Sequence, residues 1–286
     1  MLIADSVIVV TGAGGGIGAE LARRFVAAGA RAVELVDRRG KALQTVADEL
    51  GPVARVHQLD VTDESAMSDL VAAVLDRHGR IDLFCSNAGI ATGVGLQSGP
   101  LADGAWGLAW NVHVMAQVYA ARAVVPAMIA AGGGYLLNTA SAAGLLTAPG
   151  DAPYAATKHA AVAFAEWLAI EYAELGIKVS VLCPMGVDTP LLSGPLATGN
   201  ATARSVAASG PILSVGEVAD AVIEGLATET FLILPHAEVA QLWSAKAADV
   251  QSWLADTRRI YDLARAQKIL HTEDARPIDA AEWHER

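Results

Sequence analysis

Residues 11–18 read TGAGGGIG, a glycine-rich turn between an apolar run at residues 7–10 and a segment of helical periodicity. Without Cβ atoms the backbone can turn tightly and approach a ligand closely. The first N–H groups of the helix are unpaired and lie at the positive end of its dipole, so they can hold a pyrophosphate. A glycine-rich turn alone is weak evidence, but its place between a strand and a helix predicts a dinucleotide site. The residues expected to form it are Gly12, Gly15, Gly16, Ile17 and Gly18.

Short β-rich runs alternate with helical segments along most of the chain, the pattern of a parallel sheet covered by helices. The expected strands are residues 7–10, 32–36, 53–59, 81–85, 135–139, 178–182 and 231–234. A chain of 286 residues is near the upper size for one core. We therefore predict an α/β, single-domain Rossmann fold with a doubly wound parallel sheet and helices on both faces. Residues 1–235 form the dinucleotide-binding and catalytic part, and residues 236–286 form a C-terminal helical extension and polar tail of the same domain.

Asp37 ends the second expected strand, where a carboxylate can accept hydrogen bonds from the ribose hydroxyls of adenosine. A 2′-phosphate at that position would meet a negative charge, which favours NAD over NADP. Arg38 and Arg39 follow directly and could reduce this repulsion. NADP therefore remains an alternative.

The composition limits the kinds of partner that the protein is expected to bind. A formal net charge of −11 argues against nucleic acid and anionic membranes, because both would repel an acidic surface. Cys85 and Cys183 each lie in an apolar run, as buried thiols do. The seven histidines lack metal-ligand spacing, so we expect no metal. The start of the chain lacks the pattern of a signal peptide, and we expect a cytoplasmic protein.

An ordered set of motifs from about residue 7 to residue 234 resembles the short-chain dehydrogenase/reductase family. After the glycine turn the motifs are Asp60-Val61, Asn87-Ala88-Gly89, Asn111, Ser141 and the pair Tyr154 and Lys158 in the sequence YAATK. Each is common by chance, and their order makes the set specific.

The resemblance implies that Tyr154 is the acid/base. Tyr154 and Lys158 are four residues apart and share one face of a helix. An ammonium beside the phenol, together with an oxidised nicotinamide, would favour the phenolate and lower its pKa from about 10. Lys158 would also hold the nicotinamide ribose.

The resemblance assigns the remaining site residues in the same way. Ser141 would hold the substrate oxygen, and Asn111 would position a water behind the lysine. Asp60 would face the adenine amino group with the backbone of Val61 nearby, and Asn87 and Gly89 would line the adenosine side. Val187 and Thr189 would contact the nicotinamide carboxamide, although Met185 replaces the glycine usual in the turn before them.

These residues predict an NAD-dependent short-chain alcohol dehydrogenase or carbonyl reductase acting on a secondary alcohol or ketone. The alternatives are an NADP-dependent ketone or 3-oxoacyl reductase, and a non-enzymatic nucleotide-sensing regulator on the same fold. A sensor would have no need for the Ser, Tyr, Lys and Asn set.

Two later segments concern substrate and assembly. Residues 189–213 lie where the resemblance implies a substrate lid, and the leucines there favour an apolar substrate, unless they only dock the lid on the core. The C-terminal region carries an apolar stripe of Val239, Leu242, Trp243, Val250, Trp253, Leu254, Ile260 and Tyr261. This stripe either folds back on its own subunit or covers the cleft of a neighbour, and we expect a homotetramer or homodimer.

Overall fold

The computed structural model describes residues 1–96 and 99–266, and at its centre lies one parallel sheet of seven strands. The strands are β1 (Val7–Thr11), β2 (Ala32–Asp37), β3 (Ala54–Gln58), β4 (Leu83–Ser86), β5 (Gly134–Thr139), β6 (Ile177–Leu182) and β7 (Leu232–Ile233). Every expected strand is present, with ends that differ by one or two residues. The polar end expected at residues 271–286 lies outside the described residues.

The order of the strands, β3-β2-β1-β4-β5-β6-β7, creates a crevice in the middle of the sheet. From β1 the chain builds outward to β3, then returns to pair β4 with the free side of β1 and builds the other way. Where the direction of winding reverses, the loops after β1 and β4 diverge, and open α/β sheets bind ligands there. The glycine turn follows β1 and Asn87 follows β4.

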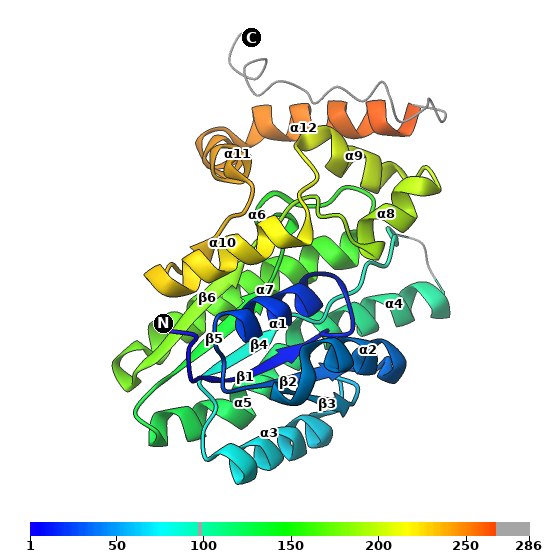
Figure 1. Ribbon diagram of the computed structural model, residues 1–286. Coiled ribbons are helices and arrows are strands. Elements are labelled where there is room, and N and C mark those ends of the chain that lie inside the picture. The colour runs from blue at the N-terminus through cyan, green and yellow to red at the C-terminus, as the bar shows by residue number, and fades with distance from the viewer. Residues whose placement is uncertain (97–98, 267–286) are drawn as a thin grey trace.

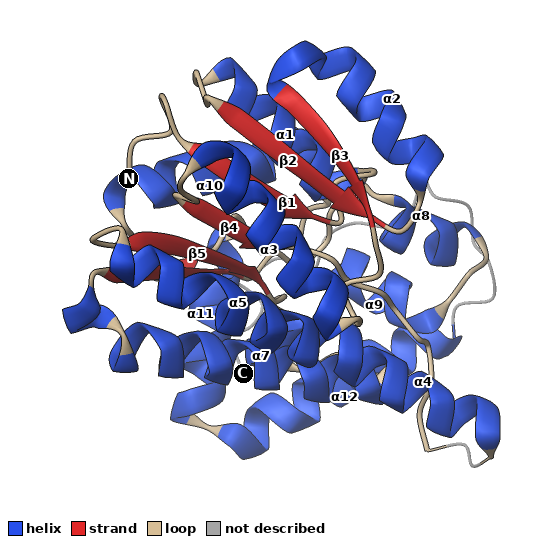
Figure 2. Ribbon diagram, turned by 90° about the horizontal axis from the view of Figure 1, so that it is seen from below, coloured by secondary structure: helices blue, strands red, loops and turns tan. Residues whose placement is uncertain are grey.

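Helices cover both faces of the sheet, as Figures 1 and 2 show. One apolar core joins the sheet to α1 (Gly16–Ala27), α2 (Gly40–Leu50) and α10 (Val215–Thr228). The other core joins it to α3 (Glu64–His78), α5 (Ala116–Ala130) and α7 (Ala152–Glu171). Strands β1, β2 and β4 are buried along their whole length, which explains why they read as mostly apolar runs rather than as alternating ones, whereas the edge strand β3 is partly exposed. The predicted α/β doubly wound fold is confirmed.

Helix α4 (Pro100–Trp110) continues through a π-helical turn, Asn111–Met115, into α5. Among the described residues, the run Leu101–Ala130 is long and apolar enough to cross a membrane by length and composition. However, 56% of its most apolar window is buried inside the protein. It has the burial of a helix that packs on a sheet.

The last helices lie over the carboxyl ends of the strands. Helices α8 (Pro190–Ala197) and α9 (Ala201–Ser209) follow β6, and α11 (Ala237–Ala248) and α12 (Val250–Ala266) follow β7. Helix α12 packs along α9 of the same chain (Figure 1), and the guanidinium of Arg204 donates a hydrogen bond to the carbonyl of Ala264 at 2.8 Å. Part of the apolar stripe therefore folds back on its own subunit, since Val239, Trp253 and Ile260 are buried. Trp243, Val250 and Leu254 are exposed.

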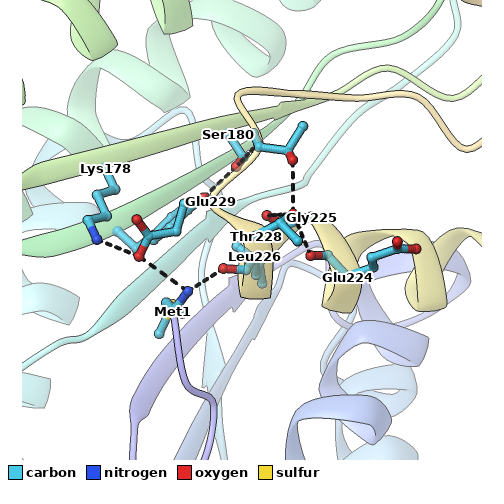
Figure 3. Close-up of polar contacts among 10 residues, drawn as sticks. Met1, Lys178, Ser180, Glu224, Gly225, Leu226, Thr228 and Glu229 are labelled. Atoms are coloured by element: carbon cyan, nitrogen blue, oxygen red, sulfur yellow. Dashed lines mark hydrogen bonds and ion pairs between the residues drawn. The ribbon is translucent and has the colours of Figure 1, made fainter.

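A polar cluster closes the opposite, amino end of the sheet (Figure 3). The amino group of Met1 bonds the carbonyl of Leu226 and lies 3.5 Å from the carboxylate of Glu229, which also pairs with Lys178. Ser180 donates a hydrogen bond to the carbonyl of Thr230 at 2.6 Å. These contacts fix the start of the chain to β6 and to the end of α10, far from the crevice.

Candidate active site

The glycine turn has the backbone shape that the sequence predicts. Gly12 and Gly16 have positive φ values of 68° and 54°, which glycine adopts without strain. A Cβ on Gly18 would lie 2.4 Å from the carbonyl oxygen of Gly12, so the helix can approach the strand only with glycine there. Gly15, the residue before α1, has no side chain to bond the first N–H groups of the helix. The turn therefore fits a pyrophosphate.

Asp37 lies at the end of β2 beside this turn and is 7% exposed. Its carboxylate accepts hydrogen bonds from the backbone N–H of Gly14 at 3.1 Å and of Arg39 at 2.9 Å. The Arg39 guanidinium donates two more, both at 3.2 Å. Burial acts to raise the pKa of Asp37, but the bonds from Arg39 and Gly14 outweigh it and hold that pKa below its usual value. Asp37 is thus an anion with its charge partly met by Arg39.

The other residues expected near adenosine lie at the ends of β3 and β4. Asn87 ties strand ends together: its amide donates to the carbonyl of Thr11 at 3.1 Å and accepts from the Thr139 hydroxyl at 3.2 Å. Asp60 is exposed and accepts a hydrogen bond from the hydroxyl of the nearby Thr62, while Val61 is buried.

Tyr154 and Lys158 lie on α7 with the Lys158 Nζ 5.6 Å from the centre of the Tyr154 ring. Asp151 starts this helix by accepting the backbone N–H of Tyr154 at 3.1 Å, and the same carboxylate accepts the hydroxyl of Thr92 at 2.6 Å. The Lys158 ammonium is 2% exposed and donates to the carbonyl of Thr139 at 3.0 Å. The helix thus holds both groups against the end of β5.

Burial sets the pKa values of this pair. It raises the pKa of Tyr154, a change that a hydrogen bond with Ser141 opposes, and it lowers the pKa of Lys158 to about 8. The sequence predicted that Lys158, together with an oxidised nicotinamide, lowers the pKa of Tyr154, whereas in the protein alone burial raises this pKa. The phenol is held in the protonated form, which can donate.

Ser141 follows β5 and is 7% exposed. Its hydroxyl donates to the carbonyl of Pro184 at 3.3 Å and accepts the backbone N–H of Ala143 at 3.1 Å. Ser141 and Tyr154 line the same cavity. The structure therefore brings together three of the four residues expected to be catalytic.

The fourth, Asn111, is not in the site. It is exposed and marks the start of the π-helical turn. His113, two residues later, is fully buried, and its ring lies edge-on to Tyr154 with centroids 5.4 Å apart. Residues two positions apart on a helix point to nearly opposite sides, so Asn111 and His113 cannot share a face. The sequence did contain a signal, a histidine between Val112 and Val114 on a buried face.

Both ring nitrogens of His113 are occupied. Nε2 accepts the backbone N–H of Ile90 at 3.0 Å and therefore carries no proton. Nδ1 then carries the hydrogen and donates it to the Thr157 hydroxyl at 2.8 Å, which donates onward to the carbonyl of Pro153 at 2.7 Å. Burial, with a smaller effect from Lys158, lowers the pKa of His113 far below its usual value. His113 is a neutral link between the loop after β4 and the helix of Tyr154.

The turn after β6 is held by a second buried histidine. His236, 1% exposed, accepts the backbone N–H of Met185 at Nδ1 (3.1 Å) and donates from Nε2 to the carbonyl of Gly186 (2.9 Å). Beyond this turn Val187 is buried, and the methyl group of Thr189 would lie 3.3 Å from a Cβ on Gly16. The turn thus runs back toward the glycine turn despite the methionine.

A cavity of about 520 Å³ opens beside Ser141 and Tyr154. Its walls come from the loop after β4, the segment after β5, helices α8 and α9, and the C-terminal helices. Among the described residues that line it, Asp151 and Tyr154 are the ionisable ones. The two oxygens of Asp151 accept the backbone N–H groups of Thr92, Gly93 and Tyr154.

Comparison with known proteins agrees with this geometry. The family model described as short chain dehydrogenase matches residues 6–197. The chain belongs to this family. It is 36% identical over 261 residues to 1-deoxy-11-beta-hydroxypentalenate dehydrogenase of Streptomyces avermitilis, covering 89% of this chain and 93% of that protein. It is 31% identical over 208 residues to 3beta-hydroxysteroid dehydrogenase of Mediterraneibacter gnavus, covering 72% and 75%.

Solved structures of short-chain dehydrogenases resemble this one closely. A Burkholderia phymatum short chain dehydrogenase/reductase in complex with NAD has a TM-score of 0.79 and 26% identity, covering 88% of this chain and 96% of that one. A Burkholderia cenocepacia short chain dehydrogenase in complex with NADP has a TM-score of 0.75 and 25% identity, covering 90% and 99%. This short-chain dehydrogenase is therefore an oxidoreductase of the hydroxyl/ketone class, with neighbours that bind either dinucleotide.

Proposed function

We propose that this short-chain dehydrogenase is an NAD-dependent enzyme that interconverts an apolar secondary alcohol and its ketone, with Tyr154 as the acid/base. The observation that carries the proposal is the meeting of Ser141, Tyr154 and Lys158 at one end of a largely apolar cavity, beside the crevice of the glycine turn.

The chain's own residues supply binding and proton transfer. The nicotinamide, when bound, takes up or supplies the hydride. Ser141 donates a hydrogen bond to the substrate oxygen, and Tyr154 donates the proton during reduction and receives it during oxidation. The Lys158 ammonium stabilises the phenolate that remains after donation. Neutral His113, with both nitrogens bonded, holds the helix of Tyr154 in place instead of passing protons.

Replacing Tyr154 by Phe tests this mechanism, because it keeps the ring and removes the proton. We expect turnover to fall by about 10²- to 10⁴-fold, while the cofactor still binds, as measured by fluorescence titration of NADH. Near wild-type turnover with a rate-limiting chemical step would refute the role of Tyr154.

The preference for NAD rests on Asp37. Its anionic form, stabilised by Arg39 and Gly14, suits ribose hydroxyls and repels a 2′-phosphate. One observation favours the NADP alternative: the Arg39 side chain is 58% exposed and could turn from Asp37 to a phosphate. The ratio of kcat/KM for NAD and NADP decides between them.

The apolar substrate is supported by the lining of the cavity. The described lining residues include no lysine, arginine or histidine that could pair with an acidic substrate, and the Asp151 carboxylate is bonded by the backbone N–H groups of Thr92 and Gly93. Apolar walls with few polar groups bind apolar ligands, because a polar group buried without a partner loses binding energy. A panel of secondary alcohols against polyols and hydroxy acids tests this, and a preference for a polyol would reject it.

We further propose a cytoplasmic homo-oligomer. Large apolar side chains are exposed on α4, α7, α11 and α12, at Trp106, Trp110, Trp167, Ile170, Trp243, Val250 and Leu254. Patches of this kind mark contacts with partners. A monomer by light scattering at micromolar concentration would reject the oligomer.

A further inference from the structure

The C-terminal helices form one wall of the cavity that holds Ser141 and Tyr154. Leu242 of α11 and Trp253, Thr257 and Ile260 of α12 line it. Positions 253, 257 and 260 recur at the spacing of one helix face. That face is the buried one, since Trp253 is 7% and Ile260 6% exposed, whereas Leu254 is 50% exposed.

Trp253 is the largest side chain of this wall, and Lys246 fixes its position. The Lys246 ammonium lies 5.0 Å from the centre of the Trp253 ring, within the range of a cation–π contact. The same ammonium donates a hydrogen bond to the carbonyl of Leu145 at 2.6 Å. Leu145 belongs to α6 (Ala143–Leu146), the short helix that follows Ser141.

This clasp of Trp253, Lys246 and Leu145 connects the wall to the segment that carries the serine. Burial lowers the pKa of Lys246, because it penalises the charged form. A tryptophan that is 7% exposed, packed in the core and contacted by Lys246 is a rigid boundary, because a close-packed ring cannot move aside for a longer ligand at small cost.

We propose that Trp253 is a specificity-determining residue that sets the greatest length of substrate the cavity accepts. The inference rests on the proposed function, and it defines the substrate class further as secondary alcohols whose apolar part extends from Ser141 and Tyr154 to α12. Trp253 takes no part in proton transfer, so its replacement changes which alcohols are accepted and leaves the chemistry in place.

The test compares Trp253→Leu and the milder Trp253→Phe with Trp243→Leu. Trp243 is a matched control, because it lies on α11, is 40% exposed and does not line the cavity. For each protein kcat/KM is measured with NAD and a series of alcohols from 2-butanol to 2-dodecanol. Circular dichroism and the melting temperature establish that each variant is folded.

We expect both Trp253 variants to move the preferred length toward longer alcohols, with kcat/KM for the longest rising about tenfold or more. We expect kcat/KM for 2-butanol to rise less than kcat/KM for the longest alcohols in both Trp253 variants, and Trp243→Leu to keep the wild-type profile. An unchanged profile in both Trp253 variants would overturn the assignment. So would the same shift in Trp243→Leu.

A binding measurement separates this inference from the proposed function. If wild-type protein oxidises none of these alcohols, the proposed function fails, and binding of 2-dodecanone is then followed by quenching of tryptophan fluorescence. Quenching that is lost in Trp253→Phe but kept in Trp243→Phe supports the wall assignment. Quenching that survives in Trp253→Phe rejects it.

Discussion

Replacing Lys158 by Met should make the folded protein more stable at neutral pH while it disables the proposed reaction. The Lys158 ammonium is buried, and burial lowers its pKa from 10.5 to about 8. Below pH 8 the folded protein therefore carries a buried charge that the unfolded chain holds in water. Met has a similar length and no charge, so the variant is free of this cost.

The size of the effect follows from the two pKa values. The difference between 10.5 and about 8, at 1.36 kcal/mol for each pH unit, is about 3 kcal/mol. The variant also loses the hydrogen bond from Nζ to the carbonyl of Thr139, which costs about 1–2 kcal/mol. The net gain in the free energy of unfolding at pH 7 is then about 1–2 kcal/mol.

The pH dependence separates the charge from the hydrogen bond. Between pH 8 and pH 10.5 the unfolded lysine keeps its proton while the folded one has lost it, so wild-type stability rises with pH relative to the variant. The advantage of Lys158→Met is complete below pH 8 and shrinks above it. It reverses between about pH 9 and pH 10, and at pH 10.5 only the lost hydrogen bond remains, which makes the variant the less stable protein.

Urea unfolding of both proteins at pH 7, 8, 9 and 10 measures this, with Lys41→Met as control because Lys41 is exposed on α2. A constant difference between Lys158→Met and wild type across that range would refute the reasoning. So would a less stable variant at pH 7.

Four further variants test other contacts. Asp37→Ala should lower the ratio of kcat/KM for NAD over NADP by about tenfold or more, because the variant loses both the charge-assisted hydrogen bond to the ribose of NAD and the repulsion of the 2′-phosphate of NADP. A higher ratio would contradict this. Arg39→Ala is the counterpart and should raise the ratio. His113→Phe keeps an aromatic ring but loses both hydrogen bonds, so kcat should fall by about tenfold or more through misplacement of Tyr154. Its kcat–pH profile between pH 5 and 8 should keep the wild-type shape, and a lost ionisation would show that His113 titrates. Glu34 is 1% exposed, and its hydrogen bonds with His57 and His78 together outweigh burial and lower its pKa. Glu34→Gln should lower the free energy of unfolding by about 1–3 kcal/mol above pH 4.5. The difference from wild type should vanish as pH falls through the lowered pKa of Glu34, which urea unfolding at a series of acid pH values measures.

The architecture was accessible from sequence because its signals are local. The glycine turn between a strand and a helix needs only residues 11–18, and Gly79, which ends α3 with a φ of 75°, is visible as a break in helical periodicity. Tyr154 and Lys158 share a helix face by spacing alone. In each case neighbouring residues along the chain determine the geometry.

Asn111 and His113 show where such reasoning fails. A motif match assigned Asn111 to the site, where it would position a water behind the lysine, but the π-helical turn and the packing against α7 decide which side chain reaches the site. His113 is recognised by Thr157 and by the backbone of Ile90, both distant in sequence. Likewise, the apolar stripe on α12 predicts that another surface covers part of this helix. The sequence does not say which surface, and the fold shows that it is α9 of the same chain.

The two ends of the cavity are formed by different parts of the chain. The match to the family model covers residues 6–197 and includes Ser141, Tyr154 and Lys158, whereas the wall formed by α9, α11 and α12 comes after it. In the proposed mechanism, substitutions beyond residue 197 change the molecule accepted and leave Ser141, Tyr154 and Lys158 in place. An identity of 36% over 261 residues supports a shared reaction more firmly than a shared substrate. When a substrate is inferred for a protein of this kind from its relatives, the residues that should agree are those of the last third of the chain.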